Sequence, residues 1–211
     1  MSQKVDTRNS TLTLVAVLVF STALLYPALA GAFFSYSGDF NLPIPAPDQP
    51  EAKQGKGWMD DAIINVPDHL IIDDIDVEIT LTHTSDFDLS IFLQNPAGTE
   101  ICLNMYNPAS EFFKGANYIN TIFDDESHVY IKQAGPPFTG QFRPLEPYTL
   151  SEFDGQDAYG DWRLRIYDGY YFNTGTLNSF QIMITTPEPA TVVLLMLGAA
   201  CLIMLRPLRR R

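Results

Sequence analysis

The fold is indicated most directly by the stretch Gly160-Asp161-Trp162-Arg163-Leu164-Arg165-Ile166-Tyr167-Asp168. Its large apolar residues occupy every second position, and the two arginines lie between them. Successive side chains of a β-strand point to opposite faces, so this period of two predicts a strand with one buried face. Trp162 is in phase with Leu164 and Ile166 and is expected to anchor the core.

The same alternation recurs along the chain. It appears in Ile75, Val77, Ile79 and Leu81, in Leu89, Ile91 and Leu93, and in Phe180, Ile182 and Ile184. Clusters of Gly, Pro, Asn and Asp separate these runs, and such residues favour turns. No segment has a helical period and no internal repeat is visible. Many short strands between turns predict an all-β domain, either a sandwich or a jelly roll.

The N-terminal segment has the pattern of a secretory signal peptide. Lys4 and Arg8 precede an apolar run from Leu12 to Leu25, and Ala28-Leu29-Ala30 follows it. This order of positive region, apolar region and A-x-A site predicts cleavage after Ala30. Residues 1–30 are therefore assigned to a signal peptide, with an uncleaved N-terminal anchor as the alternative.

The C-terminal segment has a second apolar run, bounded by a short motif and a basic cluster. Pro187-Glu188-Pro189 precedes Ala190–Leu205, and Arg206, Arg209, Arg210 and Arg211 end the chain. A run of about sixteen apolar residues is at the short limit for one transmembrane helix. Arginines stay on the cytoplasmic side of a membrane, which places everything before Pro187 outside.

This tail, residues 187–211, resembles the PEP-CTERM sorting signal of bacteria. The resemblance rests on Pro187, Glu188 and Pro189, on the apolar run, and on the terminal Arg209, Arg210 and Arg211. It implies that an exosortase, a membrane protease-transpeptidase, recognises the motif and detaches the protein from its anchor. The alternative is a plain C-terminal anchor that is never cleaved. Either way, we expect a location in the bacterial cell envelope, with possible release to the surface or matrix.

The exported part is strongly acidic. The whole chain has a net charge of −12. Without the charged residues of both terminal segments, 7 basic and 23 acidic residues remain, a net charge of about −16. Such a surface repels nucleic acid and suits divalent cations or simply solubility. Cys102 and Cys201 lie in different segments, so we expect no internal disulfide.

Residues 31–62 are rich in proline, with Pro43, Pro45, Pro47 and Pro50 at close spacing. Proline removes backbone donors and favours extended chain. We therefore expect a leader with little packing before a body at residues 63–186. The aromatic residues Phe33, Phe34, Tyr36 and Phe40 could cover a core edge or could be loose.

The body resembles the P domain, or P/Homo B domain, that follows the catalytic domain in kexin- and furin-like subtilisin proteases. The segments that carry the resemblance are Thr82-His83-Thr84, Asp86-Phe87-Asp88-Leu89, Asn95-Pro96-Ala97-Gly98-Thr99 and Gly160-Asp161-Trp162-Arg163-Leu164-Arg165-Ile166-Tyr167-Asp168. The resemblance implies a galactose-binding-like jelly-roll sandwich. It also implies a non-catalytic domain that packs on a catalytic unit and stabilises it.

No catalytic constellation is visible in the sequence. The three histidines, His69, His83 and His128, lack the glycine-flanked setting of a subtilisin triad, and the catalytic domain that normally precedes a P domain is not present. Zinc-type His/Cys spacing and nucleotide-binding glycine loops are also absent. We expect a non-enzyme, and a buried His83 that bonds to a neighbouring turn rather than acting as a base or ligand.

The loop carboxylates leave calcium as the one cofactor to consider. Asp124, Asp125 and Asp168 are the first choice of cluster, and Asp88 is next. Calcium takes six to eight oxygen ligands, and carboxylates at strand ends can supply them. The alternative is that these aspartates cap turns through hydrogen bonds to nearby backbone. Tyr167, Tyr170, Tyr171 and Phe172 likewise could bind sugars or cover the open end of the sandwich.

Two functions are consistent with these features. The first is an exported, non-catalytic surface or matrix protein, sorted by exosortase, that acts by binding or as a structural component, with extracellular polysaccharide as a possible partner. The second is an accessory P domain that docks on a separate subtilisin-like protease. The second predicts an exposed apolar patch complementary to a catalytic domain.

Overall fold

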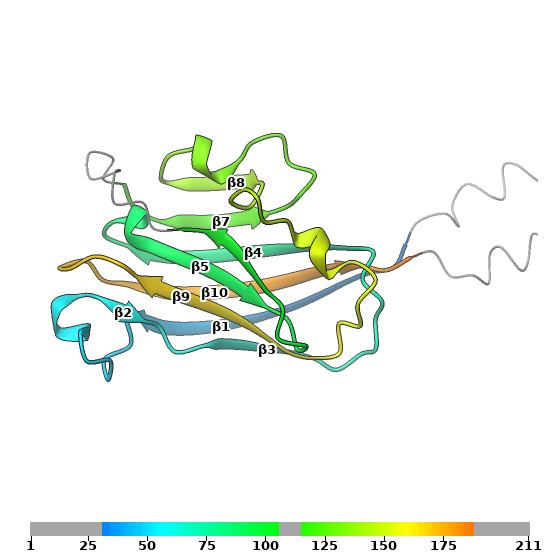
Figure 1. The fold of residues 1–211 in the computed structure, drawn as a ribbon, viewed down its shortest axis with the longest axis horizontal. Coiled ribbons are helices and arrows are strands. Elements are labelled where there is room, and N and C mark those ends of the chain that lie inside the picture. Colours follow the sequence, from blue (N-terminus) through cyan, green and yellow to red (C-terminus); the bar gives the residue numbers. More distant parts are fainter. Residues whose placement is uncertain (1–30, 106–114, 188–211) are drawn as a thin grey trace, which may run out of the picture. The chain divides into compact units, whose positions relative to one another are not determined.

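The computed structural model describes residues 31–105 and 115–187 (Figure 1). The chain divides into two compact units, of which one is Phe33–Thr186 and the other joins Met1–Ala32 with Pro187–Arg211. The first unit is the body described below. Ala28 and Ala30 of the expected cleavage site, and Glu188, Pro189, Arg209, Arg210 and Arg211 of the sorting motif, lie outside the described residues.

One sheet of the body contains five strands in the order β1-β10-β4-β7-β8. These strands are β1 (Phe33–Ile44), β10 (Gly175–Thr185), β4 (Asp74–His83), β7 (Tyr118–Phe123) and β8 (Phe138–Phe142). All neighbours are antiparallel except β7 and β8, which are parallel.

The second sheet has the order β2-β9-β5-β6, and β3 also pairs with β9. Its strands are β2 (Gly57–Trp58), β9 (Gly160–Asp168), β5 (Leu89–Gln94), β6 (Glu100–Asn104) and β3 (Ala62–Val66). Every pair in this sheet is antiparallel. Short 3-10 turns, η2 (Ala52–Gln54), η3 (Asp86–Asp88), η5 (Ile131–Gln133) and η6 (Leu150–Phe153), connect the strands.

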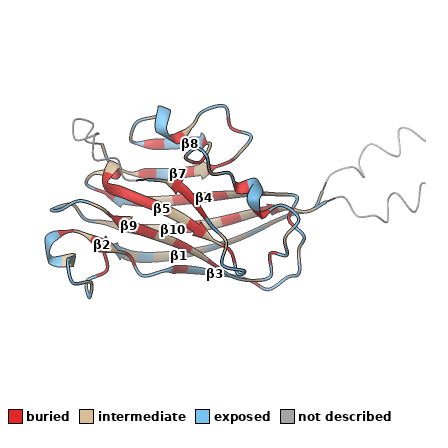
Figure 2. Ribbon diagram, in the orientation of Figure 1, coloured by how far each residue is buried: buried red, intermediate tan, exposed pale blue. Residues whose placement is uncertain are grey.

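Buried and less buried segments alternate along the strands (Figure 2), and the buried side chains of both sheets form one core cluster. Every apolar residue that the alternation assigned to an inner face is buried, including Val77 on β4, Ile91 on β5 and Leu164 on β9. Trp162 is fully buried, meets Phe153 edge to face at 5.1 Å and donates its indole N–H to the carbonyl of Ala158. The prediction of an all-β sandwich is confirmed, and the jelly-roll connectivity that the resemblance implies stays a prediction.

The prediction that residues 31–62 pack little is wrong. Phe33–Ile44 forms the longest strand of the body, β1, and pairs with β10 from Phe33↔Thr185 to Ile44↔Gly175. Ile44 is buried, and Phe40 packs on Phe180 with ring centroids 6.2 Å apart. Pro43 is compatible with this strand because β1 is the edge of its sheet, where a missing N–H need not break the ladder.

Within the described ranges, no helix is long and apolar enough to cross a membrane. The residues that the sequence assigns to a signal peptide and to a C-terminal transmembrane helix are outside those ranges.

Candidate functional site

A buried histidine–aspartate pair occupies one end of the sandwich. His83 ends β4, Asp168 ends β9, and both side chains are fully buried. Nε2 of His83 lies 2.9 Å from Oδ2 of Asp168, and Nδ1 lies 2.8 Å from the carbonyl of Ser85. Because both ring nitrogens are engaged and shielded from solvent, His83 is not placed to exchange a proton with a substrate. The predicted bond to a neighbouring turn is present.

Two further carboxylates lie beside this pair. Asp86, in η3, is fully buried, and neither of its oxygens has a hydrogen-bond partner. Desolvation is the main reason why the pKa of Asp86 rises from 3.8 to about 7. Asp88 accepts a hydrogen bond of 2.6 Å from the side-chain amide of Asn173. Burial also raises the pKa of Asp168, and the hydrogen bond from His83 opposes that rise.

Asp124 and Asp125 follow β7 and have a different role. Oδ1 of Asp124 accepts the backbone N–H groups of Glu126 at 2.6 Å and Ser127 at 3.2 Å. The two oxygens of Asp125 accept the backbone N–H groups of Leu150 and Ser151, at the start of η6. These contacts are those of residues that cap turns.

The four aspartates selected from the sequence do not meet at one place. Asp124 follows Phe123, which pairs with Val77 near the start of β4, whereas Asp168 bonds to His83 at its end. Val77 and His83 are six positions apart on β4, about 20 Å at the rise of a β-strand. In the parts of the chain that the structure describes, no three His, Cys, Asp or Glu side chains are placed to hold a metal ion. Calcium binding therefore stays a prediction.

The end of the sandwich near Asp124 concentrates negative charge. Desolvation, followed by repulsion from neighbouring carboxylates, raises the pKa of Asp76 from 3.8 to about 7. The pKa of Asp154 rises for the same reasons. Asp76 is half-buried and its Oδ1 has no hydrogen-bond partner, so its carboxylate is poorly solvated.

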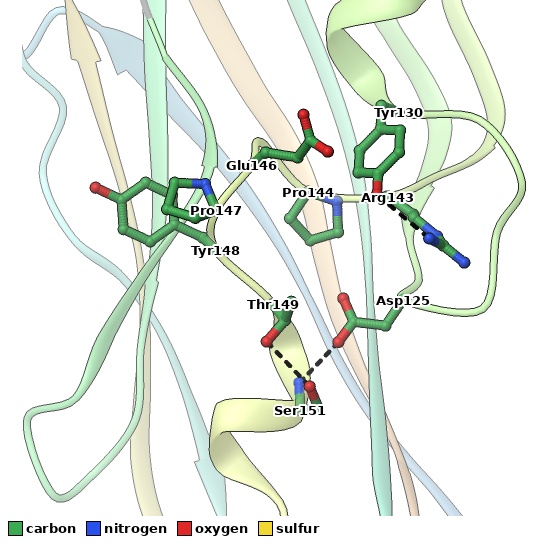
Figure 3. A pocket seen from close by; sticks show the side chains of 9 residues that line it. All are labelled: Asp125, Tyr130, Arg143, Pro144, Glu146, Pro147, Tyr148, Thr149 and Ser151. Carbon is green, nitrogen blue, oxygen red and sulfur yellow. Dashed lines mark hydrogen bonds between the residues drawn. The ribbon is translucent and has the colours of Figure 1, made fainter.

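A cleft of about 480 Å³ opens beside this end (Figure 3). Its lining residues come from the loops that follow β7 and β8: Asp125, Tyr130, Arg143, Pro144, Glu146, Pro147, Tyr148, Thr149 and Ser151. The guanidinium of Arg143 lies 5.4 Å from the ring centroid of Tyr130 and donates to the carbonyl of Ser127. Lys132 pairs with Glu146, and its hydrogen bond lowers the pKa of that carboxyl.

The polar side chains of the cleft are engaged with their neighbours. Its lining includes no histidine or cysteine, and the hydroxyl of Ser151 bonds to the hydroxyl of Thr149. Its charged side chains are already paired with neighbours.

Sequence reasoning missed several of these residues. Apart from Asp125, the residues of this cleft lie in loops without a recognisable pattern, and Trp58, at the other end of the body, lies in a strand of two residues. Asp86 is not among the aspartates selected from the sequence, since nothing in the sequence indicates that its carboxyl is fully buried.

Comparison with solved structures gives low similarity. The serine protease of Aeromonas sobria matches at 15% identity and a TM-score of 0.43, covering 74% of this chain and 27% of the protease. The complex of the Aeromonas sobria serine protease with a chaperone matches at 17% identity and a TM-score of 0.44, covering 75% and 28%. The chain thus spans just over a quarter of the length of these matched chains. No curated protein matches the sequence.

Comparison with protein families is decisive. The model of the proprotein convertase P-domain matches residues 72–184, more than half of the chain. The model of the PEP-CTERM protein-sorting motif matches residues 185–211. The matched ranges coincide with β4 to β10 and with the segment that follows β10. The chain therefore belongs to the proprotein convertase P-domain family, and its P-domain is followed directly by a PEP-CTERM sorting motif.

Proposed function

We propose that this protein is an exported, non-catalytic binding or structural module of the bacterial cell envelope, delivered by exosortase-type sorting. The observation that carries the proposal is the junction at Thr185. The P-domain match ends at residue 184, the sorting-motif match begins at 185, and β10 ends at Thr185. The last strand of the body therefore leads directly into the signal, which makes the folded body the cargo.

The finer steps of this route are part of the proposal. The apolar run after Pro189 holds the protein in the inner membrane with the body outside, and exosortase then acts at Pro187-Glu188-Pro189. The product is displayed at the surface or released to the extracellular matrix. The acidity of the body supports such an extracellular role, since a surface of about −16 stays soluble and avoids nucleic acid.

The chemistry of the body supports a role in binding. P-domains are accessory, non-catalytic domains. The one buried histidine, His83, is held between Asp168 and the carbonyl of Ser85, and the hydroxyls of Ser151 and Thr149 in the cleft bond to each other. Both features favour a binding or structural role.

The second candidate is an accessory P-domain that docks on a separate subtilisin-like protease. Family membership favours it, because the family is named for its place in proprotein convertases. Purification of the full-length protein from envelope fractions separates the two candidates. A peptidase that co-purifies in fixed proportion would support docking, and repeated isolation without any peptidase would remove it.

The sorting proposal is tested by fractionation of cells with and without exosortase. We expect a processed protein at the surface or in the matrix of exosortase-positive cells, and an unprocessed protein in the inner membrane of cells that lack it. The Glu188→Ala protein should stay unprocessed in the inner membrane even when exosortase is present. The Glu152→Ala protein, changed at an exposed position of the body, should be processed normally. A Glu188→Ala protein that is processed like the wild type would contradict the proposal.

A further inference from the structure

Aromatic side chains form two groups, joined by Lys56, at the His83 end of the body. We define the aromatic strip as Phe92, Trp58, Tyr167, Tyr171 and Phe172. The ring of Trp58 lies 6.1 Å from Phe92 and 5.0 Å from Tyr167. Tyr171 lies 6.3 Å from Phe172. Lys56 joins the two parts, since it lies 5.2 Å from the ring centroid of Tyr171 and lines a pocket with Trp58 and Tyr167.

Phe172, at the tip of the strip, is held in an unfavourable state on two counts. Its side chain is 90% exposed, although solvent disfavours an apolar ring. Its backbone has φ 72°, a left-handed conformation that is rare for a bulky residue. Strain of this kind persists only where the surrounding structure enforces it, and it is concentrated at functional sites.

The neighbouring turn enforces this conformation. The backbone N–H of Phe172 donates to the carbonyl of Gln54 at 2.6 Å. Gly55 permits that approach, because a Cβ there would lie 2.8 Å from the nitrogen of Phe172 and 2.6 Å from the carbonyl oxygen of Asn173.

The buried aspartates of this end hold the same loop from within. Oδ1 of Asp168 accepts the backbone N–H of Tyr170 at 3.0 Å, and Asp88 accepts the side-chain amide of Asn173 at 2.6 Å. Thr84 adds a hydrogen bond of 2.9 Å to Asn173. The loop that presents Phe172 is therefore held by the buried Asp88 and Asp168 and by Thr84, and its backbone conformation keeps the ring of Phe172 at the surface.

Beside the tip, the strip borders a shallow pocket of about 220 Å³. Trp58 and Tyr167 form its aromatic wall, and Gln49, Glu51 and Lys56 supply hydrogen-bonding groups around it. A pocket with aromatic walls and a few polar side chains fits a ligand that has both an apolar face and hydrogen-bonding edges. Pyranose rings have these properties, because their C–H faces stack on aromatic rings while their hydroxyl groups point outward.

We propose that the aromatic strip binds a neutral polysaccharide, with one sugar unit on Trp58 and Tyr167 and the chain continuing over Tyr171 and Phe172. This inference rests on the proposed function, because it names what the exported module holds. A row of rings suits an extended chain better than one small ligand. A neutral chain is favoured because the body, at about −16, repels polyanions.

The strip is placed for contact with an external chain. It lies at the end of the body where β9 and β4 end, on the left of Figure 1. The residues that join the body to the rest of the sequence, Phe33 and Thr186, lie at the opposite end of β10, since Phe33 pairs with Thr185. Within the body, both junction residues therefore lie at the end away from the strip.

Two measurements on the full-length protein in mild detergent test the proposal. The first is electrophoresis through native gels that contain hydroxyethylcellulose, galactomannan, dextran or the anionic alginate. We expect at least one neutral polymer to retard the protein and alginate to have no effect. Phe172→Ala should weaken the retardation roughly tenfold, as the loss of one stacked ring predicts. Tyr159→Ala removes an exposed tyrosine near the far end of β9 and should change nothing.

The second measurement uses the two tryptophans of the chain. Trp162 is fully buried, so a ligand on the strip should alter the fluorescence of half-exposed Trp58 alone. Oligosaccharides of the retarding polymer should shift the emission of the wild type and leave Trp58→Phe unchanged.

Three results would overturn the proposal: no retardation by any of the three neutral polymers, an equal loss of retardation in Tyr159→Ala, or an emission shift that persists in Trp58→Phe. Binding of a protein that depends on Phe172, without any polysaccharide binding, would also overturn the proposal. Fractionation of the same cells keeps the two ideas separate. A sorted protein that binds no polysaccharide refutes only this inference, whereas a protein that never leaves the cytoplasm refutes the proposed function.

Discussion

Replacing Asp86 by Asn should reduce the loss of stability that the body undergoes as the pH rises. The carboxyl of Asp86 is fully buried without a hydrogen-bond partner, and its pKa rises from 3.8 to about 7. Desolvation is the largest cause of this rise; the nearby backbone of Asn117 and then His83 oppose it, and Asp88 adds to it. Between these pH values the folded state binds the proton more tightly than the unfolded state. The free energy of unfolding therefore falls as the pH rises from about 4 to 7.

The size of the effect follows from the pKa shift. Each pKa unit corresponds to about 1.4 kcal/mol, so a shift of about three units sets an upper limit of about 4 kcal/mol. Structural relaxation and water entry reduce such limits, and we expect about 2 kcal/mol. For a domain of this size, that corresponds to a midpoint lower by about 4–8 °C at pH 8 than at pH 5. Asp76, with its pKa also raised to about 7, changes stability in the same direction.

The assay is thermal and urea unfolding, followed by circular dichroism at several pH values between 5 and 8. The slope of stability against pH is the quantity of interest, because an Asn amide can shift the absolute stability for other reasons. Asp86→Asn should have a smaller slope than the wild type, and Asp60→Asn, at an exposed position, should keep the wild-type slope. An unchanged slope in Asp86→Asn, or a wild type that gains stability from pH 5 to pH 8, would refute the reasoning.

Three further predictions concern the core, the first strand and calcium. His83→Ala leaves the buried carboxylate of Asp168 without its imidazole partner and should lower the free energy of unfolding by about 3 kcal/mol, measured in urea; a loss below about 1 kcal/mol would contradict the pairing. Phe40→Ser should lower the midpoint of thermal unfolding by several degrees if β1 belongs to the core sheet, whereas a loose leader would give no change. If the loop aspartates bind calcium, the midpoint of thermal unfolding should be higher with calcium than with a chelator, since a ligand of the native state stabilises it; equal midpoints would refute calcium binding.

The strands of the body could be predicted because their period of two reports burial directly. In β4 and β9 each apolar residue alternates with a polar one, so the inner face is visible in the sequence. In β1 the same alternation exists, with Tyr36, Phe40, Leu42 and Ile44 turned inward, but Gly38 interrupts it and Pro43 suggests a loop. Its place at a sheet edge, where proline is tolerated, depends on a pairing across more than 130 residues that no local pattern reveals.

The candidate sites were less predictable for a related reason. Asp124 follows a strand and Asp168 ends one, but the strands of a sandwich run to both of its ends, and the sequence alone does not say at which end each aspartate lies. The structure places them at different ends and uses both as hydrogen-bond acceptors. The aromatic residues of the loop were noticed from their clustering. Their link to Trp58 depends on the pairing of β2 with β9, which only the folded chain displays.

Mass spectrometry of the intact protein isolated from the cell envelope tests the proposed export and sorting most directly. A body exported through a signal peptide and delivered by a sorting motif should begin at Gly31 and should have lost the residues that follow Pro187-Glu188-Pro189. Isolation of a chain that still carries both Met1 and Arg211, in cells that contain exosortase, would contradict the account.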